Sequence, residues 1–279
     1  MVQLTDLSFG YNSRPPLFSG LHLSLAAGHI YGLLGKNGSG KTTLLKNMVG
    51  LRRPAAGRVT IHGEEVAKRH PDLLNRIFFL PEEPFIPDVT AKTFIAMNGG
   101  FYPLFDRSLL DAHLETFEVP TQRMLTKLSL GQQKKFMVAF ALACRTELLV
   151  MDEPTNGLDI PAKVQFRKLL AAAFDEDRCI VLSTHQVRDL DNLIDSVIVL
   201  HDGAIKLHVS LDQLTEQVRF GKVSDPKAVL YGEEAFDGTH AILPNPEGVS
   251  SKPDLELLFN AITGGSGSLL NYLEKGGIQ

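Results

Sequence analysis

One short stretch combines glycines with a lysine and two threonines at a spacing that can hold phosphate. Residues 35–43, GKNGSGKTT, fit the pattern G-x-x-x-x-G-K-[ST], with an apolar run before them and a helical pattern after them. Glycines let the backbone curl so that successive N–H groups point at phosphate oxygens. Lys41 would place a positive charge against β- and γ-phosphates, and Thr42 would offer a hydroxyl to Mg²⁺. The predicted phosphate-binding residues are Gly35, Asn37, Gly38, Ser39, Gly40, Lys41, Thr42 and Thr43.

Two acidic residues end an apolar run much later in the chain. Residues 147–154, ELLVMDEP, predict a buried strand with Asp152 and Glu153 at its carboxyl end. In α/β proteins, ligands bind outside the carboxyl ends of the strands, so both acids should lie beside the phosphate loop. We predict that Asp152 holds Mg²⁺ through water and that Glu153 is the general base for an attacking water, a role worth about 10²- to 10⁴-fold.

A histidine ends another apolar run. His185 closes the sequence STH after residues 179–183, CIVLS, so its strand should end near the same phosphate. A neutral imidazole there would hold the γ-phosphate or the base in place. We assign the other eight of the nine histidines to packing or to the surface.

A fourth motif reads as the start of a helix. In residues 128–133, LSLGQQ, Ser129 suits the N-cap and Gln132 stands three residues later, which is the spacing of a capping box. A helix N-terminus carries unpaired N–H groups and a partial positive charge, so it is a site for an anion. The alternative for this segment alone is that it only begins a helix.

The elements around these motifs predict an α/β fold. Residues 2–9, 21–25 and 57–63 alternate between apolar and polar, as half-buried antiparallel strands do. The near-continuous apolar runs 30–34, 148–151 and 179–183 suit parallel strands covered on both faces. We therefore expect a P-loop core with a parallel sheet and an antiparallel β subdomain. Residues from about 88 to 145 read as an inserted helical subdomain.

The last quarter of the chain has a different pattern. Residues 197–209 predict a hairpin with its turn at Asp202 and Gly203. We read residues 217–279 as a small C-terminal extension. It would hold strands at AVLYG and HAILP, a helix over residues 254–262, and a glycine-rich flexible tail at the end.

Composition excludes several classes of protein. The chain has 279 residues, a formal net charge of −4 and two cysteines. No apolar run approaches the roughly 18 to 20 residues that span a bilayer, and the first residues show no secretory signal pattern. Two apolar-flanked cysteines favour a reducing cytosol over a disulfide framework. The net charge argues against a nucleic-acid-binding protein, which would usually show a basic face.

Five motifs in a fixed order, GKNGSGKTT, LSLGQQ, LLVMDEP, NGLD and STH, resemble those of the ATP-binding subunits of ABC transporters. The resemblance covers residues 1–216, which we take as one ATP-binding domain, and implies ATP and Mg²⁺ as cofactors. It implies that Tyr11 stacks on adenine. It also implies that LPEEP, with Glu82, stands in the place of the Q-loop beside the metal, and that residues 156–159 form the D-loop.

The resemblance also implies partners. Two such subunits pack head to tail, so Ser129, Gly131 and Gln132 of one would face the γ-phosphate bound by the other, in a homodimer or with a paralogous ATPase subunit. A polytopic membrane permease would hold the pair at the inner face of the membrane. It would dock on the aromatic segment that follows Glu82. The alternative is that the side chains of this segment only pack the helical insert. They are the aromatic residues Phe85, Phe94, Phe101, Tyr102 and Phe105, together with Ile86.

The sequence departs from the family pattern at two positions. The motif LSLGQQ stands in the place of the family's signature motif, and its Leu130 stands where that motif usually has Gly. Glu82 stands where the Q-loop usually has Gln. The leading function is an ATPase that powers a transporter, and the LPEEP form resembles exporters with separate membrane subunits. The alternative is a soluble ABC-type ATPase acting on nucleic acid or ribosomes. Such proteins usually carry coiled-coil insertions or two ATPase units, and this sequence has neither. A kinase or GTPase would not explain the signature together with the histidine.

Overall fold

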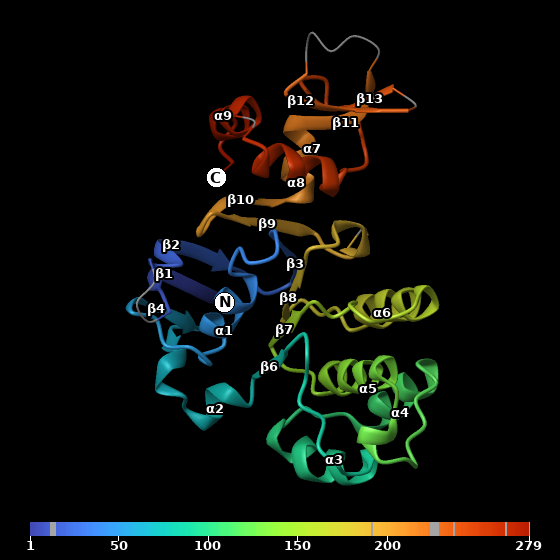
Figure 1. Cartoon of the computed structure of the whole chain (residues 1–279). Coiled ribbons are helices and arrows are strands. Elements are labelled where there is room, and N and C mark those ends of the chain that lie inside the picture. The colour runs from blue at the N-terminus through green and yellow to red at the C-terminus, as the bar shows by residue number, and fades with distance from the viewer. Residues whose placement is uncertain (12–14, 191, 224–228, 237, 266, 279) are drawn as a thin grey trace. The chain divides into compact units, whose positions relative to one another are not determined.

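The computed structural model describes residues 1–11, 15–190, 192–223, 229–236, 238–265 and 267–278. The chain divides into two units (Figure 1). The first unit consists of Met1–Ile30 and Thr42–Ser183, and the second of Tyr31–Lys41 and Thr184–Gln279. The division falls between Lys41 and Thr42, inside the predicted phosphate-binding motif.

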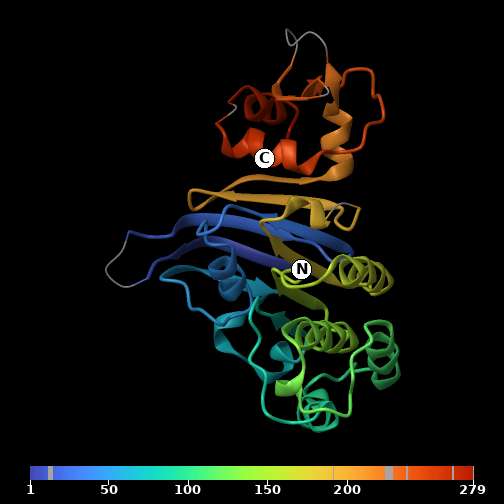
Figure 2. The ribbon, with the colours of Figure 1, turned by 45° about the vertical axis from the view of Figure 1, so that its right-hand side comes forward.

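The first unit begins with an antiparallel sheet in the order β2-β1-β4-β5, of which β1 and β2 are drawn in dark blue in Figure 2. Its strands are β1 (Val2–Phe9), β2 (Phe18–Leu25), β4 (Ala56–Ile61) and β5 (Glu64–Glu65). In β2 the side chains of Leu21, Leu23 and Leu25 are buried while His22 and Ser24 are exposed, because successive residues of a strand point to opposite faces. The antiparallel subdomain predicted from this alternation is confirmed.

Three parallel strands form the core of the first unit. They are β6 (Ile77–Leu80), β7 (Leu148–Asp152) and β8 (Cys179–Thr184), with β7 between the other two. Every residue of β7 and β8 is buried, as expected of parallel strands covered on both faces. The register pairs Asp152 with Ser183 at the carboxyl ends of their strands. The sequence analysis identified β7 and β8 and missed the four-residue strand β6.

The helices of the first unit pack around these strands. They are α1 (Lys41–Met48), α2 (Pro71–Leu74), α3 (Ala91–Asn98), α4 (Arg107–Thr116), α5 (Leu130–Ala143) and α6 (Ile160–Ala172). Figure 1 shows α3, α4 and α5 grouped together, in the stretch that was predicted to be helical. In α5 all residues from Phe136 to Ala143 are buried, so this helix is the centre of the group. Among the described residues, no helix is both long and apolar enough to cross a membrane.

The second unit contains the strand that leads into the phosphate loop. β3 (His29–Leu34) enters this unit at Tyr31 and pairs in parallel with β9 (Ser196–His201), which pairs antiparallel with β10 (Ala204–Ser210). Asp202 and Gly203 turn the hairpin with φ angles of 49° and 72°. Positive φ at both central residues defines the type I′ turn that suits a two-residue hairpin, so the predicted hairpin is confirmed.

The C-terminal part of the second unit is a small sheet with three helices. The sheet has the order β11-β13-β12. Its strands and helices are α7 (Leu211–Gln217), β11 (Val218–Val223), β12 (Tyr231–Ala235), β13 (Gly238–Pro244), α8 (Leu255–Thr263) and α9 (Gly267–Lys275). The predicted strand at HAILP and the helix over residues 254–262 are confirmed. Of the strand predicted at AVLYG, Ala228 lies outside the described residues.

The prediction of a flexible tail was wrong. Residues 267–275 form helix α9, in which Leu269 and Leu273 are buried. These two leucines stand four residues apart, so they lie on one face of a helix and remove apolar surface from water. The glycines on both sides of this segment hid that spacing. Ser266 and Gln279 lie outside the described residues.

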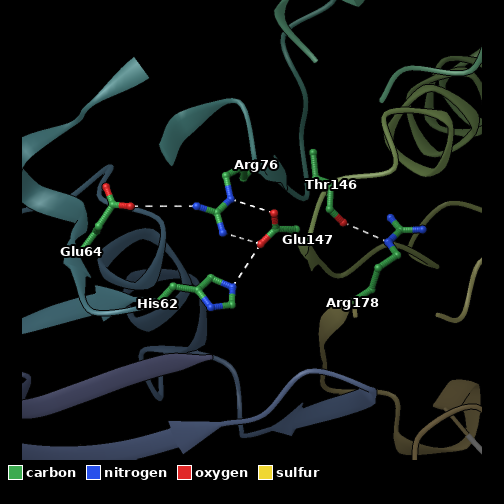
Figure 3. Close-up of polar contacts among 6 residues, drawn as sticks. All are labelled: His62, Glu64, Arg76, Thr146, Glu147 and Arg178. Carbon is green, nitrogen blue, oxygen red and sulfur yellow. Dashed lines mark hydrogen bonds and ion pairs between the residues drawn. The ribbon is translucent and has the colours of Figure 1, made fainter. Parts of the chain in front are cut away.

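A polar cluster joins three segments of the first unit (Figure 3). Arg76 donates two hydrogen bonds of 2.7 Å to the carboxylate oxygens of Glu147, and His62 Nε2 lies 3.0 Å from the same carboxylate. Glu64 lies 3.9 Å from Arg76. The Arg76 guanidinium lowers the pKa of Glu147. Beside this cluster, Arg178 Nε donates to the carbonyl oxygen of Thr146 at 2.9 Å. The bidentate pair ties the start of β7 to the start of β6.

Replacing this carboxylate should change how stability depends on pH. A lowered pKa means that Glu147 stabilises the fold above its ordinary pKa of about 4.3, and that this contribution is lost as the pH falls through the folded-state value. We expect Glu147→Gln to melt a few degrees below the wild type at pH 7, which corresponds to about 1 kcal/mol. The difference should shrink below about pH 4. Thermal melting by circular dichroism measures this, with the exposed Glu115→Gln as control. A pH-independent difference would contradict the assignment.

Candidate functional site

The loop from Gly35 to Lys41 follows β3 directly. Lys41 Nζ donates to the carbonyl oxygen of Gly35 at 2.8 Å and to that of Lys36 at 3.4 Å, which closes the loop on itself. Gly40 has a φ of 102°, a conformation that side chains disfavour. A Cβ on Gly35 would lie 2.9 Å from the carbonyl oxygen of Leu200, so this position has room for glycine alone. The glycines of the motif are therefore required by the loop's shape.

The same loop holds a buried hydroxyl without a partner. Among the described residues, Ser39 Oγ has no hydrogen-bond partner. A buried polar group normally has one, because leaving it unpaired costs free energy. An anionic ligand such as phosphate would supply that partner. The loop's glycines, its lysine and this hydroxyl therefore fit a nucleotide phosphate.

Thr42 directly follows Lys41 in the chain and contacts Asp152, the first of the two predicted acids. Its Oγ1 donates to Asp152 Oδ2 at 2.6 Å, and Ser183 Oγ donates to Asp152 Oδ1. The residues of the first hydrogen bond are 110 positions apart in the sequence. A hydroxyl beside a carboxylate is a set of hard oxygen donors of the kind that Mg²⁺ takes. Thr42 and Asp152, two of the three residues predicted to hold the metal, thus fit it, and Ser183 was not among those predicted.

Glu153 is buried and its backbone is in an unusual conformation. Glu153 is 4 % exposed, and its φ is 47°, in the left-handed region that residues other than glycine rarely adopt. The Glu153 N–H donates to the carbonyl oxygen and to Oγ of Ser183, both at 3.1 Å. Such conformations persist where surrounding contacts over-determine them, and they cluster at active sites.

A buried lysine lies between two of the predicted segments. Lys134, in α5, donates from Nζ to the carbonyl oxygens of Glu82 at 2.6 Å and of Glu153 at 3.0 Å. The pKa of Lys134 is lowered, mainly because burial disfavours its charged form, and the neighbouring acids offset part of this shift. The Glu82 side chain accepts a hydrogen bond of 2.8 Å from Asn156 Nδ2. Lys134 was not predicted, because Lys134 and Lys135 both precede the apolar run of α5 and no local pattern distinguishes one from the other.

Helix α5 begins at the motif LSLGQQ, as predicted. Ser129 is the N-cap of α5: its Oγ accepts from the Gln132 N–H at 3.2 Å, and Gln132 Oε1 accepts from the Ser129 N–H at 3.1 Å. The capping box is therefore confirmed. Ser129 and Leu130 are exposed, and Gly131 and Gln132 are half-buried. In the first unit this helix end is open to solvent.

Tyr11 is held by three neighbours. Its hydroxyl lies 3.0 Å from Thr43 Oγ1, Phe9 packs edge-on at 5.1 Å between ring centroids, and the Arg52 guanidinium stands 5.8 Å from the ring centroid. The contact with Thr43 places the ring next to the residue that follows Thr42. Tyr11 remains partly exposed, so its ring has surface left for another planar group.

His185 lies in the second unit, directly after β8. It is exposed, and the preceding Thr184 accepts a hydrogen bond of 2.9 Å from the Gln186 N–H through its hydroxyl. Within the first unit the structure brings together Thr42, Asp152, Glu153 and Glu82. The second unit contains His185 and the loop through Lys41.

Comparison with known proteins agrees with this arrangement. Residues 18–156 match the family model for ABC transporters. The bacitracin transport ATP-binding protein of Bacillus licheniformis is 32% identical over 245 residues, which is 85% of this chain and 80% of that protein. The ATP-binding protein for SkfA peptide export of Bacillus subtilis is 29% identical over 231 residues, 80% of this chain and 94% of that protein.

A solved structure supports the same assignment. The ATP-binding subunit of an ABC transporter is 25% identical and superposes with a TM-score of 0.69 over 77% of this chain and 91% of that one. The likeness covers most of both chains and agrees with the parallel and antiparallel strands described above. The chain therefore belongs to the ABC transporter family, whose nucleotide-binding ATPase domain it carries.

Proposed function

We propose that this chain supplies the energy for a membrane exporter whose membrane-spanning part is a separate subunit. The observation that carries the proposal is the pair Thr42 and Asp152, joined at 2.6 Å directly before the buried Glu153. The two proposed metal-binding residues and the proposed base Glu153 would then lie together at the carboxyl end of β7. Relatives named for bacitracin transport and for peptide export support the same reading.

The residues take the following roles in this proposal. The loop through Lys41 binds the phosphates of ATP, and Tyr11 stacks on adenine. Thr42, Asp152 and Glu82 would hold Mg²⁺, which when bound neutralises charge on the β- and γ-phosphates. Glu153 accepts the proton of the attacking water. His185 orients the γ-phosphate or the base from the end of β8.

The open end of α5 supports a head-to-tail dimer. Ser129, Gly131 and Gln132 would contact the γ-phosphate of ATP bound by a second copy or by a paralogous subunit, because a helix N-terminus attracts anions. Leu130 is 83 % exposed and lies at this end, where a partner would cover it. ATP that binds only the dimer would stabilise the dimer by mass action. In this proposal residues 1–216 form the ATP-binding domain and residues 217–279 an appended extension.

An aromatic surface on the helical insert supports a membrane partner. Phe101 is 69 % exposed and lines a cavity of about 610 Å³ together with Phe78, Phe94, Tyr102 and Phe140. Exposed aromatic side chains beside an apolar hollow are typical of protein interfaces. We propose that a cytoplasmic helix of the permease docks here, which would keep the chain in the cytoplasm at the inner face of the membrane.

Replacing Phe101 tests this docking surface. We expect Phe101→Ser to lower recovery of the permease at least tenfold, because truncating a central aromatic anchor costs about 2 kcal/mol or more. ATP hydrolysis by the isolated chain should be unchanged, because Phe101 lies outside the nucleotide site. Phe174→Ser, which alters another exposed phenylalanine, is the matched control. Equal recovery with both variants would exclude this surface.

The transporter assignment itself is tested by purification from membranes. The tagged chain is recovered from detergent-solubilised membranes of the native cell, and its companions are identified by mass spectrometry. We expect a polytopic membrane protein in stoichiometric amount. Recovery with ribosomes or nucleic acid instead would contradict the transport proposal and would favour a soluble ABC-type ATPase.

A further inference from the structure

The ammonium of Lys134 is buried and lies on two backbone carbonyls. The residue is 6 % exposed, and Nζ donates to the carbonyl oxygens of Glu82 at 2.6 Å and of Glu153 at 3.0 Å. Lysine is almost never fully buried unless its charge is compensated. Here the carboxylates of Glu82, Asp152 and Glu153 supply that compensation. A long, flexible side chain kept out of water in this way fixes the groups that it touches.

One of those groups is the backbone of the proposed base. Glu153 has its φ in the left-handed region, and Ser183 holds its N–H from one side. On the other side its carbonyl oxygen accepts from Lys134 Nζ and, at 3.2 Å, from the Asn156 N–H. Among these partners, Lys134 comes from α5, so it determines where this peptide lies relative to that helix.

The other group is the loop after β6. Lys134 holds the carbonyl of Glu82, and Asn156 Nδ2 holds the side chain of the same residue at 2.8 Å. Because Asn156 also donates its N–H to Glu153, the hydrogen bonds close a ring through Lys134, Glu82, Asn156 and Glu153. This ring lies at a cavity of about 490 Å³ that Glu82, Lys134 and Asn156 help to line. A shift of the Glu82 loop would therefore move the carbonyl of Glu153, through Lys134 from the Glu82 carbonyl and through Asn156 from the Glu82 side chain.

We propose that Lys134 is a positioning residue: it holds the backbone of Glu153 in its left-handed conformation and ties it to the Glu82 loop, and so sets the rate of hydrolysis without contributing to ATP affinity. The proposal rests on the proposed role of Glu153 as the base. Lys134 contacts carbonyl groups of the protein, and so it acts through Glu153. A base displaced by about 1 Å can lose about 10²-fold in rate.

The test compares Lys134→Met, Lys134→Gln and, as matched control, Lys135→Met, which makes the same change at the next residue of α5. We expect Lys134→Met to lower kcat about 10²-fold, with KM and the dissociation constant for ATP within about twofold. Lys134→Gln retains a donor and should recover at least half of this loss on a logarithmic scale. Lys135→Met should keep kcat near the wild-type value. Circular dichroism checks folding, and if Lys134→Met does not fold, the comparison rests on Lys134→Gln.

A double-mutant cycle separates this proposal from the one on which it rests. In single-turnover measurements, Lys134→Met combined with Glu153→Gln should be no slower than Glu153→Gln alone, because a positioning residue loses its effect once its target cannot act. Unchanged kcat in the lysine variants, a change in KM alone, or multiplied losses in the double variant would overturn the role of Lys134. Full activity of Glu153→Gln by itself would overturn the base assignment instead.

Discussion

Glu153→Gln is expected to bind ATP as the wild type does and to hydrolyse it about 10²- to 10⁴-fold more slowly, which is the usual contribution of a general base. An amide has nearly the shape of a carboxylate but cannot accept the proton of the attacking water. The hydrogen bonds to Lys134 and Ser183 use its backbone carbonyl and N–H, which the substitution keeps. The variant should therefore stay folded, and ATP should hold it as a dimer that fails to separate.

Steady-state phosphate release and size-exclusion chromatography with and without ATP measure these two effects. Glu82→Gln is a suitable control, because it replaces the neighbouring acid by the family's usual residue and keeps an oxygen to accept from Asn156. We expect its turnover to change less than tenfold, as the base is intact. If Glu153→Gln turns over at the wild-type rate, Glu153 is not the base, even if the remaining site assignments hold.

Lys41→Ala is expected to lose ATP affinity by about 10- to 150-fold, the equivalent of 1.5 to 3 kcal/mol for hydrogen bonds to a charged group. Two losses combine. The positive charge beside the phosphates disappears, and so do the hydrogen bonds by which Lys41 closes the loop on Gly35 and Lys36. The loop would then have to be ordered by the ligand, which costs further binding energy.

Isothermal titration calorimetry with ATP measures this loss. Lys36→Ala is the matched control, because Lys36 is an exposed lysine in the same loop and contributes its backbone carbonyl to the contact. Its affinity should stay within a few-fold of the wild type. Normal ATP binding by Lys41→Ala would contradict the phosphate-loop assignment.

Short-range patterns predicted their structures well. The capping box of Ser129 and Gln132 spans three residues, and the Asp202–Gly203 turn needs only a positive φ at both positions. Continuous apolar runs identified β7 and β8, because parallel strands are buried on both faces. The strand β6 is only four residues long, so its apolar run was too short to be recognised as a strand. Helix α9 was missed because glycines flank its two buried leucines.

The sequence by itself determined the family, through five short motifs in a fixed order, and it predicted the phosphate loop and its acids. Each of these motifs depends on residue types within a few positions of one another. Tertiary structure alone decided which distant groups meet. Thr42 reaches Asp152 across 110 positions, and Lys134 reaches Glu82 across 52 and Glu153 across 19. A lysine in an apolar helix has no local pattern that names its partners. They follow from how α5 packs against the ends of β6 and β7, because packing brings together groups that no short-range pattern relates.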